Sequence, residues 1–241
     1  MHQRPGLITP HGRLSIMQDI EVKISLVTRL SDQDLEDVVS ISDHAYRDAM
    51  SPGVSLLTGG KLELIPGLFR AMTRCCLMDG ECYIATEVST QNIVGTALWF
   101  PPGKQLWDTD ELRQASGFDV FYDKLDQATK DWWINEYCGQ VAAFLKEHYG
   151  PETQQESWWL NNVAVLPEYQ GNGIATSLLH KVLKKAATNE AIGLCTDSEK
   201  NVVFYKSLRF KEIGVFHIRH PVDGSDVKVW GFKQYGLGVR T

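Results

Sequence analysis

Apolar side chains recur along the chain with two different periods, and the change of period divides the sequence into elements. Apolar and polar residues alternate from Ile20 to Leu26, which predicts a strand with one buried face. Ser31, followed by the carboxylate of Asp34, has the spacing of a helix N-cap, and the helical period that follows predicts a helix to about Asp48. The same reasoning predicts strands over 81–88, 93–100, 158–165, 192–196, 211–218 and 227–235, and helices over 62–78, 174–183 and 200–208. The mixture predicts one α/β unit without internal repeats.

The segment from 109 to 149 carries aromatic residues at helical spacing among charged ones, and we expect two helices there. It stands between the third and fourth predicted strands and is much longer than a direct connection needs. We expect this insertion, about 104–150, to shape a pocket. The alternative, that its aromatic residues only fill a core, stays open.

Composition limits the class of protein. The chain has 241 residues, of which 43% are hydrophobic and 22% charged, as expected of one globular domain. Its net charge of -6 is dispersed, and no basic run favours a nucleic-acid partner. The five cysteines have neither CxxC nor Cys/His ligand spacing, so we expect free thiols and no metal. With no apolar run long enough for a membrane span, we expect a cytoplasmic protein with a flexible tail over 1–19 and a single domain over 20–241.

Two glycines, Gly171 and Gly173, stand where a predicted strand ends and a helix begins. Such a turn lets backbone N–H groups and the helix dipole face a phosphate, and Ala175 keeps the first helical turn thin. A tight turn without a ligand remains the alternative. The mononucleotide pattern GxxxxGK[ST] is absent, and the dinucleotide pattern GxGxxG fails at Thr176.

Two ordered segments resemble the GNAT family of N-acetyltransferases. Gln170, Gly173 and Ala175 match the family pattern Gln/Arg-x-x-Gly-x-Gly/Ala. Downstream, residues 201–210 look like the family's segment in which an asparagine is followed by a tyrosine and a terminal Gly-Phe. The resemblance covers 158–216 closely and reaches back to residue 20 by the order of elements. It implies a mixed, mostly antiparallel sheet of about six or seven strands flanked by helices, with a helical insertion between the third and fourth strands.

The resemblance also implies a donor site for acetyl-CoA. The pantetheine arm would lie where the strand ending at Val165 parts from strand 192–196, and the pyrophosphate would lie over the glycine turn. The residues so implied to bind acetyl-CoA are Val163, Ala164, Val165, Gln170, Gly171, Asn172, Gly173, Ile174, Ala175, Thr176, Asn201 and Tyr205. Tyr205 would be the catalytic acid, because a phenol can protonate the leaving thiolate. A backbone N–H near Val163 or Ala164 would polarise the thioester carbonyl. A purely structural tyrosine beside Phe204 is the alternative.

Two features depart from the family pattern or leave it incomplete. Arg209 stands where the family usually has a glycine with positive φ, so the helix must be strained there or end differently. The general base is unassigned, because no carboxylate lies between Ser157 and Val165. Asp43, His44, Glu87 and Asp197 are the candidates, each of which is also compatible with a solvated surface group.

The insertion and the Trp158-Trp159-Leu160 run resemble the small-molecule branch of the family that includes puromycin N-acetyltransferase. This resemblance implies transfer of an acetyl group to a small amine in a ternary complex. Aromatic residues able to stack on a flat acceptor are Trp99, Trp107, Trp132, Trp133 and Tyr137. A protein or peptide acetyltransferase and a non-catalytic acyl-CoA-binding or amine-sensing module are the alternatives. Monomer and homodimer both stay open.

Overall fold

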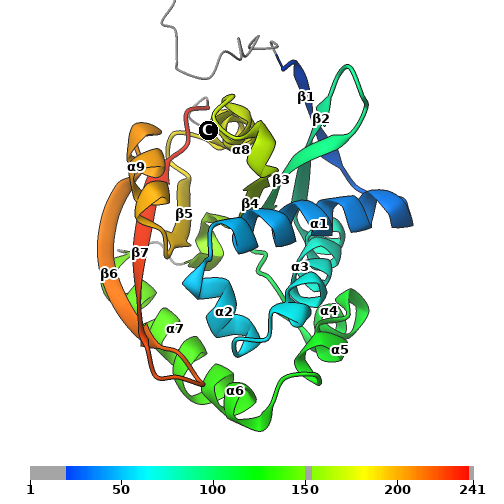
Figure 1. Cartoon of the computed structure of the whole chain (residues 1–241). Helices are drawn as coiled ribbons and strands as arrows, with labels where there is room; N and C mark the ends of the chain where they lie inside the picture. Colours follow the sequence, from blue (N-terminus) through cyan, green and yellow to red (C-terminus); the bar gives the residue numbers. More distant parts are fainter. Residues whose placement is uncertain (1–19, 150–153, 239–241) are drawn as a thin grey trace, which may run out of the picture.

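One seven-stranded sheet organises the part of the chain that the computed structural model describes, residues 20–149 and 154–238 (Figure 1). Its strands are β1 (Val22–Val27), β2 (Glu81–Glu87), β3 (Ile93–Phe100), β4 (Trp158–Val165), β5 (Ala191–Thr196), β6 (Lys211–Arg219) and β7 (Asp226–Tyr235), in the spatial order β1-β2-β3-β4-β5-β7-β6. Only β4 and β5 pair in parallel. The predicted mixed, mostly antiparallel sheet is confirmed, whereas the predicted tail over 1–19 lies outside the described residues.

Helices cover both faces of the sheet because the strands alternate two sets of apolar side chains. On β3, Leu98 and Phe100 pack against α1 (Asp32–Asp48) and α3 (Ile65–Asp79). Their neighbours Ala97 and Trp99 point to the opposite face, against α8 (Ile174–Lys185). The short α9 (Glu199–Ser207) shares the face of α8, since Tyr205 belongs to the same apolar cluster. Single 3₁₀ turns occupy Leu62–Leu64, Gln154–Glu156 and Pro167–Tyr169.

The helix α2 (Pro52–Thr58) was not predicted from the apolar pattern, although its ends carry clear signals. Ser51 accepts a hydrogen bond from the N–H of Val54, Pro52 occupies the first turn, and Gly59 ends the helix at φ 62°. At seven residues the helix is too short for its apolar spacing to show a period. It lies beside β7 and turns one end toward β5, which makes it a wall of the site described below.

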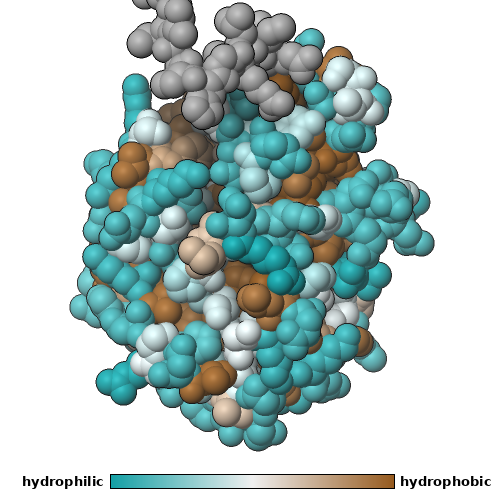
Figure 2. Space-filling model, viewed as in Figure 1, coloured by the Kyte–Doolittle hydropathy of each residue, from teal (hydrophilic) through white to brown (hydrophobic). Residues whose placement is uncertain are grey.

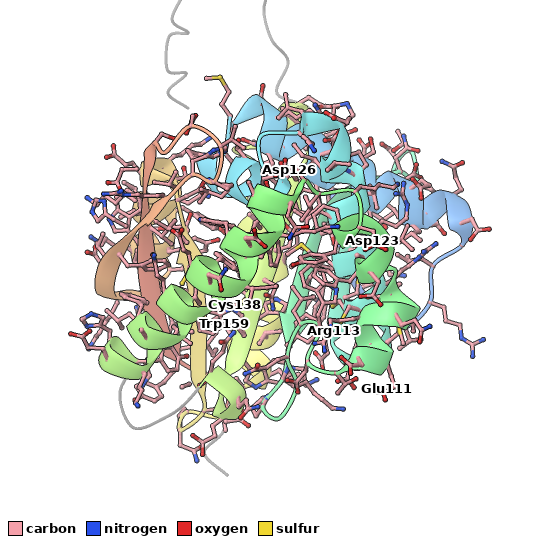
Figure 3. All side chains as sticks on the ribbon, turned by 90° about the horizontal axis from the view of Figure 1, so that it is seen from below. Glu111, Arg113, Asp123, Asp126, Cys138 and Trp159 are labelled. Atoms are coloured by element: carbon pink, nitrogen blue, oxygen red, sulfur yellow. The ribbon has the colours of Figure 1, made fainter. Side chains whose placement is uncertain are left out.

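The predicted insertion between β3 and β4 is helical, but the prediction of two helices is wrong. It contains α4 (Asp110–Ser116), α5 (Phe118–Tyr122), α6 (Gln127–Trp132), a π-helical turn (Trp133–Tyr137) and α7 (Cys138–His148). Gly117, at φ 83°, ends α4, and the Asp126 carboxylate caps α6. The helical run from α6 through α7 crosses in front of the sheet in Figure 3, with Cys138 on it and Trp159 of β4 close behind.

The centre of the sheet is interrupted between β4 and β5. Their pairing begins at Trp158 and Ile192 and ends at Leu160 and Leu194. On the other side of β4, the register against β3 shifts between Leu98 and Trp99, which leaves Asn161 as an extra residue. A bulge bends a strand away from its neighbour, so β4 and β5 diverge beyond Leu160. This is the gap that the sequence analysis expects beside residues 162–165.

The surface around this frame is largely hydrophilic, with hydrophobic residues gathered in patches between the polar ones on the face seen in Figure 2. All five cysteines are free thiols. Among the helices of the described ranges, none has both the length and the apolar character to cross a bilayer.

Candidate active site

The turn between β4 and α8 has the geometry of an anion-binding loop. Gly171 and Gly173 adopt φ values of 83° and 75°, in the left-handed region that side chains disfavour. A Cβ atom at either position would meet nothing within 4 Å, so the backbone conformation rather than packing requires glycine. No side chain caps the start of α8, and its first turn has no acidic residue. Its N–H groups and the positive end of its dipole are therefore available to a phosphate.

Side chains of the loop hold its backbone in place. Gln170 donates from Nε2 to the carbonyl of Val165 over 3.1 Å, and Asn172 donates from Nδ2 to the carbonyls of Tyr169 and Gln170. The Ile174 side chain is buried in the core, so only its backbone faces the turn. The structure adds Lys200, whose Nζ lies 3.3 Å from Oε1 of Gln170. The sequence gives no spacing rule that would have found this lysine, because it comes from α9, thirty positions along the chain.

Asn201 and Tyr205 both come from α9, the helix that follows β5. Asn201 donates to Oγ1 of Thr196 over 3.4 Å and so ties the helix to the end of β5. Tyr205 is 4% exposed, and its ring lies 5.8 Å from those of Phe210 and Phe232. Burial raises the pKa of the Tyr205 phenol well above its usual range, and the nearby Tyr46 and Asp197 raise it further. The phenol therefore keeps its proton at neutral pH.

Arg209 adopts the conformation for which the family pattern uses glycine, with φ at 70°. The N–H of Phe210 bonds the carbonyl of Tyr205 over 3.1 Å, and the N–H of Arg209 bonds the carbonyl of Lys206 over 3.0 Å. These two bonds, with the ring contact between Phe210 and Tyr205, form a Schellman motif. The helix end is thus retained with an arginine held in a left-handed conformation, and the motif fixes the position of Tyr205.

A cavity of about 240 Å³ lies against the diverging ends of β4 and β5 and is lined by residues of α1, α2, α3, α7, β6 and β7. Its wall is mainly apolar, and its aromatic members are Tyr46, Phe69, Tyr137, Trp159 and Phe216. Of the aromatic residues expected to stack on an acceptor, only Tyr137 lines this cavity. Trp99, Trp132 and Trp133 are buried in the core, and Trp107 packs on Phe118 and Trp133. These four tryptophans pack against other side chains of the fold. The spacing of aromatic residues in the sequence does not distinguish such packing from the lining of a pocket.

Polar groups meet where the cavity approaches the gap in the sheet. The Tyr46 hydroxyl donates to Oδ1 of Asn162 over 3.0 Å, and Asn162 donates to Ser42. Asp197, directly after β5, accepts at Oδ2 from the Ser51 hydroxyl over 2.8 Å and from the N–H of Gly53 over 2.6 Å. Burial, and secondarily Asp197, raise the pKa of Tyr46. Besides burial, Tyr46 and Asp197 also raise the pKa of Tyr205, so the phenols of Tyr46 and Tyr205 and the carboxylate of Asp197 share one region.

The four candidate bases have different surroundings in the structure. Asp43 forms an ion pair with Arg47 at 2.6 Å, and Nδ1 of His44 lies 2.7 Å from the carbonyl of Ser40 on the same helix. Glu87 lies on the β2–β3 hairpin, where hydrogen bonds from Thr90 and Tyr169 lower the pKa of its carboxyl group. Only Asp197 lines the cavity.

The comparisons with known proteins agree with this geometry. The sequence model described as the Acetyltransferase (GNAT) family matches residues 96–210. No curated protein matches the chain in sequence.

Several solved structures share the fold. One is a crystal structure described as histone acetyltransferase HPA2 and related acetyltransferase from Corynebacterium glutamicum, with 18% identity, 90% of this chain and 97% of that chain covered, and a TM-score of 0.53. Another is described as an arylalkylamine N-acetyltransferase 7 from the yellow fever mosquito, with 16% identity, coverage of 88% and 87%, and a TM-score of 0.57. A third is the C-terminal condensation domain of Ebony in complex with beta-alanyl-dopamine, with 10% identity, coverage of 90% and 99%, and a TM-score of 0.60.

The family match contains the parted strands, the glycine turn and the helix that carries Tyr205. At these identities the solved structures establish the fold alone, whereas the family match concerns the sequence of residues 96–210. The family match over residues 96–210 and the shared fold therefore identify a GNAT acetyltransferase domain in this chain and support an acyltransferase.

Proposed function

We propose that this protein transfers the acetyl group of acetyl-CoA to the amine of a small molecule, by direct attack of the amine on the thioester in a ternary complex. The observation that carries the proposal is the mainly apolar cavity of about 240 Å³ that lies against the gap between β4 and β5. In this proposal the donor would reach the gap from the glycine turn and the acceptor from the cavity, so that the two substrates meet at the gap.

Acetyl-CoA is the cosubstrate of the family, and the residues around the gap fit it. Gly171 to Thr176 offer uncapped N–H groups to the pyrophosphate, and Lys200 adds a positive charge beside Gln170. Val163, Ala164 and Val165 follow the last residue of β4 paired with β5, so their backbone groups on that side are available to the pantetheine amides. Asn201 would border the arm from α9. Acetyl-CoA would supply the activated acyl group.

The chemistry needs one acid near the sulfur. In the proposed step the amine nitrogen attacks the thioester carbonyl carbon, the carbon–sulfur bond breaks, and the Tyr205 phenol gives its proton to the leaving thiolate. The proton that the nitrogen loses restores the phenol directly or through water, so that an amide and free CoA result. The high pKa of Tyr205 supports this role, because a phenolate would have no proton to give. An N–H of Val163 or Ala164 would stabilise the oxyanion.

The size of the cavity favours a small acceptor. Pockets for drug-sized ligands measure roughly 300–1,000 Å³, and this one measures about 240 Å³. The aromatic wall suits a flat or branched apolar body. Two structural neighbours bear names that refer to arylalkylamines and to beta-alanyl-dopamine, which supports a small amine here without identifying it.

The proposal is tested by measuring thiol release from acetyl-CoA with a panel of small amines, aminonucleosides and lysine peptides, beside thermal stabilisation by acetyl-CoA alone. We expect stabilisation together with turnover of at least one small amine. Much faster turnover of histone or ribosomal peptides would favour a protein acetyltransferase. Stabilisation without turnover of any acceptor would favour a non-catalytic acyl-CoA-binding module.

A further inference from the structure

We propose that Asp197 makes the acceptor cavity select amines that carry no acid group, so that a simple amine is acetylated and the corresponding α-amino acid is refused. The inference rests on the N-acetyltransferase function proposed above and narrows its substrate class. It concerns the charge of the cavity, which the fold of the family does not determine.

The described residues that line the cavity provide one carboxylate and no cation. Asp197 is the single acidic side chain of that lining, and no lysine, arginine or histidine belongs to it. An ammonium group entering this apolar space would find a partner of opposite charge. A carboxylate entering it would lose its hydration without gaining a cationic partner, which is strongly unfavourable.

Asp197 is held in one orientation, so that one of its oxygens is committed and the other is available. Oδ2 accepts from the Ser51 hydroxyl and from the N–H of Gly53, the two groups at the start of α2. Within the described residues, Oδ1 has no hydrogen-bond partner. The bonds to α2 fix the carboxylate before a ligand arrives, which lowers the cost of ordering it on binding.

The same position suits both protonation states of the acceptor. An ammonium group can donate to Oδ1 when it binds, and after it loses one proton to water the neutral amine still has N–H groups for the carboxylate. Its lone pair is then free for the thioester. In an α-amino acid the carboxylate is attached to the carbon that bears the nitrogen, so it cannot lie far from Asp197 when the nitrogen is bound. Like charges at that distance repel.

The other side chains that line the cavity indicate what kind of body the acceptor carries. Leu56, Leu57, Leu68 and Met72 come from α2 and α3, and Ile218 and Val229 from β6 and β7. These side chains offer apolar contact to the body of the acceptor. The preferred acceptor is thus a primary amine with a compact apolar or aromatic body and no second charge.

Matched pairs of ligands test the inference. We would measure kcat/KM for phenethylamine against phenylalanine, tryptamine against tryptophan, and isoamylamine against leucine, together with calorimetric binding of each ligand in the presence of CoA. We expect each amine to exceed its amino acid by at least about 100-fold in kcat/KM and to bind at least about tenfold more tightly.

Two variants distinguish the effect of the Asp197 charge from the effect of its hydrogen bonds to α2. Asp197→Asn keeps an oxygen acceptor for Ser51 and Gly53, and we expect it to raise the KM of the amines about 10–100-fold and to shrink the amine preference, with the KM of acetyl-CoA unchanged. Ser51→Ala weakens the support of α2 but keeps the charge, so the preference should persist. Asp48→Asn removes an exposed carboxylate outside the cavity and is the matched control for net charge.

Each outcome bears on a different claim. Equal binding of both members of the pairs, binding by none of them, or an unchanged preference in Asp197→Asn would overturn the inference. Calorimetry decides this even without turnover. A complete lack of thiol release beside selective amine binding would refute the proposed acetyl transfer and leave the selectivity of the cavity standing.

Discussion

Tyr205 is suited to act as an acid because its surroundings disfavour its anion. The ring lies among Phe204, Phe210 and Phe232, and burial, together with the charges of Tyr46 and Asp197, raises the pKa of its phenol. Removing the hydroxyl in Tyr205→Phe should lower kcat about 10²–10⁴-fold, the usual contribution of a general acid. Acetyl-CoA binding should change little, since the ring remains. Steady-state kinetics and calorimetry with acetyl-CoA make this comparison.

Tyr83→Phe is the matched control, because Tyr83 is another buried tyrosine, bonded to Glu81 on β2 and outside the cavity lining. A kcat of Tyr205→Phe equal to that of the control would leave Tyr205 as a structural residue.

The pH dependence of turnover follows from the same burial. The pKa of Tyr205 lies above the ordinary phenol value of about 10, so its acid form persists throughout the neutral and mildly alkaline range. We expect kcat to rise with pH as the acceptor loses its ammonium proton, and then to level off without a fall up to about pH 10. A decline of kcat between about pH 8 and 9.5, under conditions where the protein is still folded, would contradict a buried phenol as the acid.

Arg209 stores backbone strain that a glycine would remove. A left-handed conformation costs an L-residue roughly 1–2 kcal/mol, part of which glycine loses again through its freedom in the unfolded chain. We expect Arg209→Gly to increase the free energy of unfolding by about 0.5–1 kcal/mol, measured by urea denaturation. Arg209→Ala, which keeps a Cβ atom, should give no such gain. Equal stabilisation by both substitutions would show that the side chain, and not φ, carries the strain.

At the level of elements, the loop before α8 matters through its backbone. Gly173→Ala introduces a Cβ atom at φ 75° with no clash, so its effect acts on the loop conformation. We expect the substitution to cost about 1 kcal/mol and to raise the Kd of acetyl-CoA several-fold. Gly224→Ala is a matched control, since Gly224 also has positive φ and open space but lies in the β6–β7 turn. Equal Kd values for the two variants would argue against a backbone role in donor binding.

The sequence predicted those elements whose own residues determine them. The strand 93–100 and the strand 158–165 were predicted with their observed bounds, because long apolar stretches end there at prolines and polar turns. The helix α2 was not predicted, although Ser51, Pro52 and Gly59 mark both of its ends, because seven residues are too few to show a helical period. The insertion was divided too coarsely for the same reason, since Gly117 and Asp126 end and start helices within it.

The candidate site was predictable only where it is local in sequence. The residues of the donor turn follow one another along the chain, so a motif could identify them. Asp197 gains its place from bonds to Ser51 and Gly53, which lie 146 and 144 positions away. No period or spacing links these segments, and the cavity between them arises only from packing. Sequence reasoning therefore named Asp197 as one candidate among four without a reason to prefer it.

At the level of the whole molecule, buried thiols and phenols should make the protein sensitive to alkali. Burial raises the pKa of Cys82 and of Cys195 to about 12, and raises the pKa of Tyr46 and Tyr137 as well. In the unfolded chain the pKa values return to about 8.5 for cysteine and about 10 for tyrosine. A folded pKa above the unfolded one favours the native state fully below the unfolded value, and the advantage is lost as the pH rises toward the folded value.

The free energy of unfolding should therefore stay constant from about pH 7 to 8 and fall above about pH 8.5. Once a thiol such as Cys82 is ionised in the unfolded chain and still protonated in the native one, it contributes a loss of about 1.4 kcal/mol per pH unit. Urea denaturation at pH 7.5 and pH 10 with a reductant present measures this slope. Cys82→Ala should be less stable at pH 7.5 but lose less stability on going to pH 10, because one ionising group has been removed from the core. Identical stability at both pH values would mean that these thiols and phenols are already accessible to water in the native protein.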